Sequence, residues 1–386
     1  MQLHFISPAD IVFQILVYRL WPVWLAMAIL MGTSYRYRKK LGLYGQLYDS
    51  GVGIAGVAIL SFWFFAAVFS RYVSPFNPLE QIAVMRNALP GAIEPHSGQA
   101  YLLGGDKLAR DVFSRVVDGS RIVLLIAPLA TLVALTVGIT LGLPAGYFGR
   151  KADSLLSFLA NLVLAFPVIL LFYLLVSPEI VETGLPRWTA GVFFAFPIIL
   201  ACIAFGTRYI GRPLLLAVQL LIVLAITYWL YSTFVFFDDP FGLIQVTPST
   251  LNIFVAVVFA SSPGVFRIVR GLVMDIKTRD YVAAAQTRGE NPWYIMVWEV
   301  LPNARGPLIV DACLRIGYTT ILLGTLGFFG LGMPPESPDW GTTIKDGSQL
   351  LRAFVHPALP PAIALMSFVL GLNLLADALR EESLKD

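Results

Sequence analysis

One pair of ionisable residues, Asp311 and Arg315, falls inside a clearly apolar stretch of this chain of 386 residues. The two are four positions apart, so a helix would place them on one face. A membrane carboxylate can couple transport to an ion gradient, but a charge in lipid usually pairs with its opposite or faces a wet cavity. We expect an intramembrane ion pair that neutralises itself near the end of a span, with a place in the substrate path as the alternative.

The rest of the sequence offers little reaction chemistry. Three scattered histidines and two cysteines, Cys202 and Cys313, form no metal-ligand pattern, and no paired acids suggest acid–base catalysis. The Gly-x-x-x-x-Gly-Lys-Ser/Thr loop that cradles nucleotide phosphates is missing from the sequence. We therefore predict no catalytic residue, no metal site and no cofactor in this chain, and any ATP-driven work would be powered by another subunit.

A polar segment at residues 267–305 interrupts the apolar sequence and reads as two short helices with a sharp turn between them. An alanine-rich stretch favours the first helix, and a glycine able to adopt the left-handed conformation follows it. Two rigid helices on the wet side of a membrane protein indicate a docking surface. The residues expected to bound them are Asp280 as cap and Gly289 as stop for the first helix, and Asn291 with Pro292 as start and Pro302 as end for the second.

The composition places the chain in a lipid bilayer. Hydrophobic residues make up 57% of the chain and charged residues only 13%, with a mean hydropathy of +0.75, whereas soluble domains carry roughly a quarter charged residues. The net charge of +3 is too small and dispersed to indicate nucleic acid. Uncharged runs long enough to cross the membrane predict eight spans, at 51–70, 122–148, 154–177, 188–207, 213–237, 240–266, 316–335 and 353–376.

A ninth apolar run at 11–33 contains Arg19 and Pro22, so it either crosses or lies in the interface. Lysine and arginine near span ends set the orientation, because cytosolic loops carry the excess of positive charge. If the basic residues at 36–40 are cytosolic, the whole 267–305 segment is cytosolic too. The C-terminus is then also expected in the cytosol.

The two short helices resemble the EAA loop of binding-protein-dependent ABC importer permeases. Ala283 stands where that family usually has glutamate. In the family this loop sits in a groove of the ATPase subunit and moves with it. The resemblance implies an ATPase-coupling loop at 280–302 containing Asp280, Tyr281, Ala284, Ala285, Arg288, Gly289, Leu301 and Pro302.

Further motifs resemble the dipeptide, oligopeptide and nickel permeases of the second-subunit type within that family. They lie at 103–115, at 145–149 with Asp153, at 164–167, and at 328–341, in family order. Gly105 and Ala109 depart from the first motif, where the family has threonine and glycine. The resemblance implies a loop that meets the binding protein at Asp106, Arg110, Asp111 and Arg115, although these could be only solvated loop charges.

We expect an all-α, polytopic transmembrane bundle with a six-helix permease core and about three additional helices. Residues 1–50 would form an N-terminal extension with a basic cytosolic segment, and 51–386 the permease, with its core at 51–177 and 240–386 and an inserted helix pair at 188–237. The resemblance implies a bacterial inner membrane importer of peptides, nickel chelates or related small polar solutes. Its implied partners are a homologous permease, two ABC ATPases that bind ATP and Mg, and an extracytoplasmic solute-binding protein.

Two other classes of function remain as alternatives at this point. A secondary transporter driven by an ion gradient would rest on Asp311, its only carboxylate within a clear span. A membrane enzyme would need a cluster of catalytic side chains, which the sequence does not supply.

Overall fold

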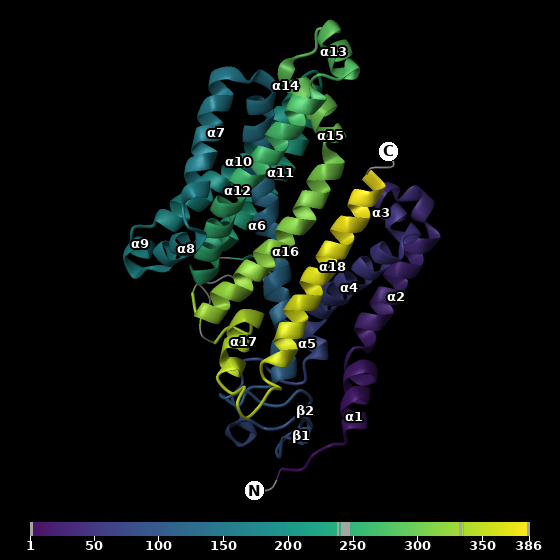
Figure 1. Cartoon of the computed structure of the whole chain (residues 1–386), viewed down its shortest axis with the longest axis vertical. Helices are drawn as coiled ribbons and strands as arrows, with labels where there is room; N and C mark the ends of the chain where they lie inside the picture. The colour runs from purple at the N-terminus through teal and green to yellow at the C-terminus, as the bar shows by residue number, and fades with distance from the viewer. Residues whose placement is uncertain (1–2, 238, 241–247, 332–333, 335, 384–386) are drawn as a thin grey trace. The chain divides into compact units, whose positions relative to one another are not determined.

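The computed structural model describes residues 3–237, 239–240, 248–331, 334 and 336–383 (Figure 1). The chain divides into two compact units. The first contains residues 1–127 and 316–386, and the second contains residues 128–315. Two long helices, α6 (Val112–Phe148) and α16 (Arg305–Phe329), each begin in one unit and end in the other.

The first unit is built mainly from helices, with one two-residue strand pair. Strands β1 (Ala92–Ile93) and β2 (Ala100–Tyr101) are antiparallel. The helices are α1 (Pro8–Phe13), a π-helical turn (Gln14–Arg19), α2 (Trp21–Arg36), α3 (Gly42–Gln46), α4 (Gly51–Val68), α5 (Ser70–Val73), α17 (Trp340–Ser348) and α18 (Leu359–Ser383), with short 3-10 turns at Arg38–Lys40, Leu47–Asp49 and Ala83–Met85.

The second unit is helical throughout its described residues. Its helices are α7 (Arg150–Ala165), α8 (Val168–Val176), α9 (Pro178–Glu182), α10 (Leu185–Tyr209), α11 (Pro213–Phe236), α12 (Pro248–Ile276), α13 (Asp280–Thr287), α14 (Pro292–Tyr294), a π-helical turn (Ile295–Val300) and α15 (Leu301–Asn303). In Figure 1 α13 lies at one extreme end of this unit.

Seven helices among the described residues are long and apolar enough to cross a membrane: α4, α6, α10, α11, α12, α16 and α18. This confirms the predicted all-α polytopic bundle. The N-terminal run forms an eighth candidate, because the helical stretches Pro8–Arg19 and Trp21–Arg36 pass the same test together but meet at an angle of 53°. Pro22 lies directly after this bend, where its missing N–H interrupts the helix ladder. Whether this bent pair crosses the membrane stays a prediction.

The run expected to span the membrane at 154–177 is not one continuous helix, and whether its two parts cross the membrane together stays a prediction. The segment forms two helices, α7 and α8, which are separated at Phe166 and Pro167. Phe166 is extended (φ −80°, ψ 130°), the conformation that a following proline imposes by steric conflict with the α region. Among the described residues, neither helix alone meets the length needed for a span.

The inserted pair expected at 188–237 corresponds to α10 and α11. Aromatic rings join the pair to α12. The ring centroid of Phe254 in α12 is 5.5 Å from that of Phe194 in α10 and 4.7 Å from that of Phe234 in α11. Only 6% of the apolar window of α11 is buried, against 67% for α12. About half of the residues of α11 are exposed, and these are left to lipid or to another protein.

Candidate functional site

The turn after α13 is a complete helix stop. Gly289 has a φ of +78°, its N–H donates to Gln286 O, and the N–H of Glu290 donates to Ala285 O. These two bonds and the left-handed residue form a Schellman motif. The predicted stop at Gly289 is confirmed. The predicted cap is wrong, because Arg279 occupies the N-cap position and Asp280 is the first helical residue. At that position the negative charge of Asp280 still stabilises the helix through its dipole.

The second short helix begins as predicted and ends later than predicted. Asn291 is its N-cap, with Oδ1 accepting a hydrogen bond of 2.9 Å from Trp293 N, and Pro292 follows in the first turn. Pro302 does not end it. A π-helical turn at Ile295–Val300 leads into α15, in which Pro302 takes an early position where its missing N–H costs little. The helical path therefore continues to Asn303, just before α16 starts.

One face of α13 is buried and the other is exposed. Val282 and Ala285 are fully buried against a core cluster that includes side chains of α12 and the π-helical turn. We define the docking face by four exposed residues, Tyr281, Ala283, Ala284 and Arg288; Asp280, Gln286 and Thr287 are exposed as well. Of the two alanines assigned to the coupling loop, Ala285 thus anchors the helix from inside and Ala284 lies on the outside.

Polar contacts tie this loop to other helices of its unit. Gln286 Nε2 donates to the Tyr147 hydroxyl at 3.1 Å, and Lys277 Nζ donates to Gly146 O at 2.8 Å, at the end of α6. Trp298 Nε1 donates to Ala204 O in α10 at 2.9 Å. These bonds connect the loop to α6 and α10, and the chain itself connects it to α12. None of these partners is near in sequence, so no local pattern could indicate them.

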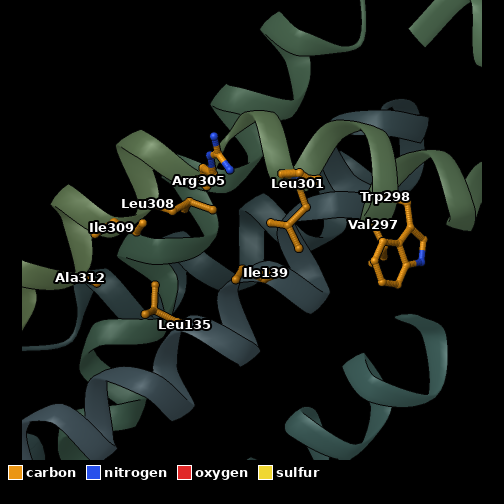
Figure 2. Close-up of a pocket in the computed structure, with 10 residues that line it drawn as sticks. Leu135, Ile139, Val297, Trp298, Leu301, Arg305, Leu308, Ile309 and Ala312 are labelled. Atoms are coloured by element: carbon orange, nitrogen blue, oxygen red, sulfur yellow. The ribbon is translucent and has the colours of Figure 1, made fainter. Parts of the chain in front are cut away.

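An open groove lies directly behind the end of the loop (Figure 2). It has a volume of about 370 Å³ and is almost wholly apolar. Its walls come from α6, the π-helical turn, α15 and α16. The lining residues are Leu135, Ile139, Val297, Trp298, Leu301, Pro302, Arg305, Leu308, Ile309 and Ala312.

The predicted pair in α16 is confirmed as an ion pair. Arg315 Nε donates to Asp311 Oδ2 at 2.6 Å, and Arg315 Nη1 donates to Ser261 O at 3.2 Å. Both side chains are largely buried. The Asp311 carboxylate is thus neutralised by its own helix, which removes the main support for an ion-coupled transporter.

The 104–115 loop in the first unit is a buried ionic network rather than a charged surface. Arg110 Nε donates to Asp106 Oδ2 and its Nη2 donates to Asp346 Oδ2, both at 2.7 Å. Arg115 Nη2 donates to Ser337 O at 2.8 Å. The two arginines and Asp106 and Asp111 are at most 1% exposed. The alternative that these four residues are only solvated loop charges is therefore wrong, since they hold the loop to the segment that precedes and forms α17. The expected contact of this loop with the binding protein stays a prediction.

Asp111 sits at the start of α6 and accepts two hydrogen bonds from Ser114, of 2.9 Å from the amide and 2.6 Å from the hydroxyl. Burial raises its pKa to about 6, although both Ser114 bonds act in the opposite direction. The sequence motif flagged Asp106, Arg110, Asp111 and Arg115. It did not reveal Asp346, whose place in the network depends on tertiary contacts.

The structure describes only part of the last family motif, the one at 328–341. Gly332 and Pro335 lie outside the described residues. Trp340 is buried, and its Nε1 donates to Val116 O at 2.9 Å. Its ring centroid is 5.0 Å from that of Trp63. This motif therefore forms part of the core of the first unit.

Comparisons with known proteins agree with this architecture. Residues 138–381 match the family described as binding-protein-dependent transport system inner membrane component. The di/tripeptide transport system permease protein of Pseudomonas aeruginosa is 30% identical, over 89% of this chain and 92% of that protein. The dipeptide transport system permease protein of Haemophilus influenzae is 28% identical, over 82% of this chain and 84% of that protein.

A third relative is named for a different substrate. The glutathione transport system permease protein of Pectobacterium atrosepticum is 28% identical, over 86% of this chain and 84% of that protein. The family match covers well over half of the chain, and these alignments extend it across most of the remainder. This chain therefore belongs to the inner membrane components of binding-protein-dependent transport systems, as a multi-pass transport subunit that works with a binding protein and an ATPase.

Proposed function

We propose that this chain is one of two homologous permease subunits of an ABC importer for short peptides. Two partner ATPase subunits would bind ATP and Mg and hydrolyse the nucleotide, and an extracytoplasmic binding protein would deliver the solute. The relatives are named for the transport of dipeptides, di- and tripeptides, and glutathione. Their shared chemical class is short peptides, which supports that class for this chain.

The docking face of α13 is the proposed contact with the ATPase. A single observation carries this proposal: α13 is fixed on one side by Val282 and Ala285 and presents Tyr281, Ala284 and Arg288 to solvent on the other. A helix held in this way transmits a push, because its buried side chains cannot slide without disturbing a close-packed core.

Movement of the loop would then tilt the helices attached to it. The contacts of Gln286 with Tyr147 and of Trp298 with Ala204 lead to α6 and α10, and the chain itself leads to α12 and α16. A rigid-body change of these helices would switch the permease between inward-facing and outward-facing states. In this arrangement the loop and the C-terminus lie in the cytosol, as the distribution of lysine and arginine favours.

The proposal is tested by blocking the docking face without touching the core. We expect Ala284→Trp to leave the protein folded in the membrane but to abolish its co-purification with the ATPase subunits and peptide uptake in reconstituted vesicles. The matched control is Ala9→Trp, since Ala9 is an exposed alanine in α1 of the other unit. Normal assembly and uptake with Ala284→Trp would show that the ATPase docks elsewhere.

A further inference from the structure

The groove behind the coupling loop has walls of a single chemical kind. Nine of its ten lining residues are apolar, and the tenth is Arg305. The one polar group on an aromatic side chain there, the Trp298 Nε1–H, already donates to Ala204 O. A peptide backbone in this groove would leave its own N–H and C=O groups unpaired, which is costly. The groove therefore fits a hydrocarbon rather than a polar solute.

The charged margin of the groove lies at the end of a candidate membrane span. Arg305 is the first residue of α16, and its exposed side chain points away from Leu135 and Ile139 (Figure 2). A second exposed guanidinium, that of Arg208 near the end of α10, lies 4.2 Å from the centroid of the Trp298 ring. Arginine and tryptophan at span ends are typical of the level at which lipid headgroups meet the protein.

Arg305 carries an exposed guanidinium. Within the part of the chain that the structure describes, its guanidinium makes no ion pair or side-chain hydrogen bond. An anion that binds here would complete its hydrogen bonding, and a phosphate matches the planar donor fork of arginine.

The charge at the margin of the groove favours an anionic lipid as its occupant. The groove has a volume of about 370 Å³, its walls are almost wholly apolar, and one exposed guanidinium stands at its edge. A phospholipid supplies both complementary parts, an acyl chain for the walls and a phosphate for the guanidinium.

We propose that this groove binds an anionic phospholipid, with an acyl chain against Leu135, Ile139 and Ile309 and the phosphate on Arg305. The lipid would join α6 to the start of α16 and to the π-helical turn, so it would stabilise the joint between the loop and the spans. The proposal concerns binding by this chain and does not depend on which ATPase or substrate the transporter uses.

The test measures lipid binding by the purified full-length protein. Native mass spectrometry and thermal unfolding in mild detergent are compared with added phosphatidylglycerol and with phosphatidylcholine of the same acyl chains. We expect phosphatidylglycerol to bind more tightly, and Arg305→Gln to weaken this binding about fivefold, as the loss of one basic residue at an anionic lipid surface predicts. Ile309→Trp, which fills the groove, should weaken the binding of both lipids.

The matched control is Arg36→Gln, which removes an exposed arginine at the end of another helix, α2, and should leave binding unchanged. Equal binding of the two lipids, or equal affinity in Arg305→Gln and Arg36→Gln, would overturn the proposal. Stabilisation by glycerol phosphate alone to the same extent would replace the lipid with a free anion. Cross-linking of a cysteine at position 309 to another subunit in the assembled transporter would assign the groove to a protein interface instead.

Discussion

The 104–115 loop and the 280–302 loop are both charged, motif-bearing segments between apolar helices, yet they treat their charges in opposite ways. In the first loop Arg110 is 1% exposed and pairs with two carboxylates. In the second loop the Arg288 side chain is 56% exposed and pairs with Glu299 at 2.9 Å. Exposed ion pairs contribute little to stability, whereas removing one partner of a buried pair strands a charge. The charges of the first motif thus maintain the fold, whereas those of the second remain on an exposed surface.

The sharpest way to break this comparison is to remove the central arginine of the buried network. We expect Arg110→Met to destabilise the protein by about 3–5 kcal/mol, because Asp106 and Asp346 would lose their shared partner. Thermal unfolding in detergent and the folded yield measure this effect. Lys107→Met is the control, since Lys107 also pairs with Asp346 but is 27% exposed, and it should cost much less. Equal losses in the two variants would contradict the distinction between buried and exposed charges.

The buried loop should also show a pH dependence that centres on Asp111. Burial raises the pKa of Asp111 to about 6, so between about pH 4 and pH 6 the folded protein holds a proton that the unfolded chain has released. Stability should therefore fall by about 3 kcal/mol as pH rises through this window. Comparing the wild type with Asp111→Asn across pH 4 to 7.5 isolates the effect. Across this window the free energy of unfolding of the wild type should fall by this amount relative to that of Asp111→Asn. A difference between the two proteins that does not change with pH would refute the raised pKa of Asp111.

In the coupling loop the largest effect should come from its backbone rather than from its charges. Gly289→Val places a β-branched residue at φ +78°, which costs about 1–2 kcal/mol although open space surrounds the position. We expect the protein to insert normally but to lose substrate-stimulated ATPase activity and uptake. Gly289→Asn is the matched control, because asparagine tolerates the left-handed conformation better. Normal coupling with Gly289→Val would remove this turn from the mechanism.

The smallest effect should come from the exposed ion pair. Arg288→Ala removes the 2.9 Å contact with Glu299 and should change stability by less than about 1 kcal/mol. If Arg288 contacts the ATPase instead, its loss should weaken subunit binding while leaving the unfolding temperature almost unchanged. A loss of stability as large as that of Arg110→Met would show that the two loops are alike.

Much of the fold followed from one-dimensional patterns. The apolar runs predicted all seven spanning helices, because a span must be about 20 apolar residues long wherever it sits. The bounds of α4, α10 and α11 were predicted within three residues, whereas α6, α12, α16 and α18 begin or end six to eleven residues away from the predicted bounds. Local chemistry also predicted the stop at Gly289 and the cap at Asn291, since both depend on backbone bonds between near neighbours. Pro167 itself indicated the break between α7 and α8. The segment around it is so apolar that the whole of it was interpreted as one span.

The sequence by itself determined the membrane class, the family and the Asp311–Arg315 pair, because composition, motifs and an i,i+4 spacing act over short distances. Only the tertiary structure decided that Arg110 and Arg115 are buried, that Ala285 faces inward, and that a groove forms beside Arg305. Burial depends on which distant segment covers a side chain. The partners of Arg110 and Arg115 at 337–346 are more than two hundred residues away, beyond the reach of any local pattern.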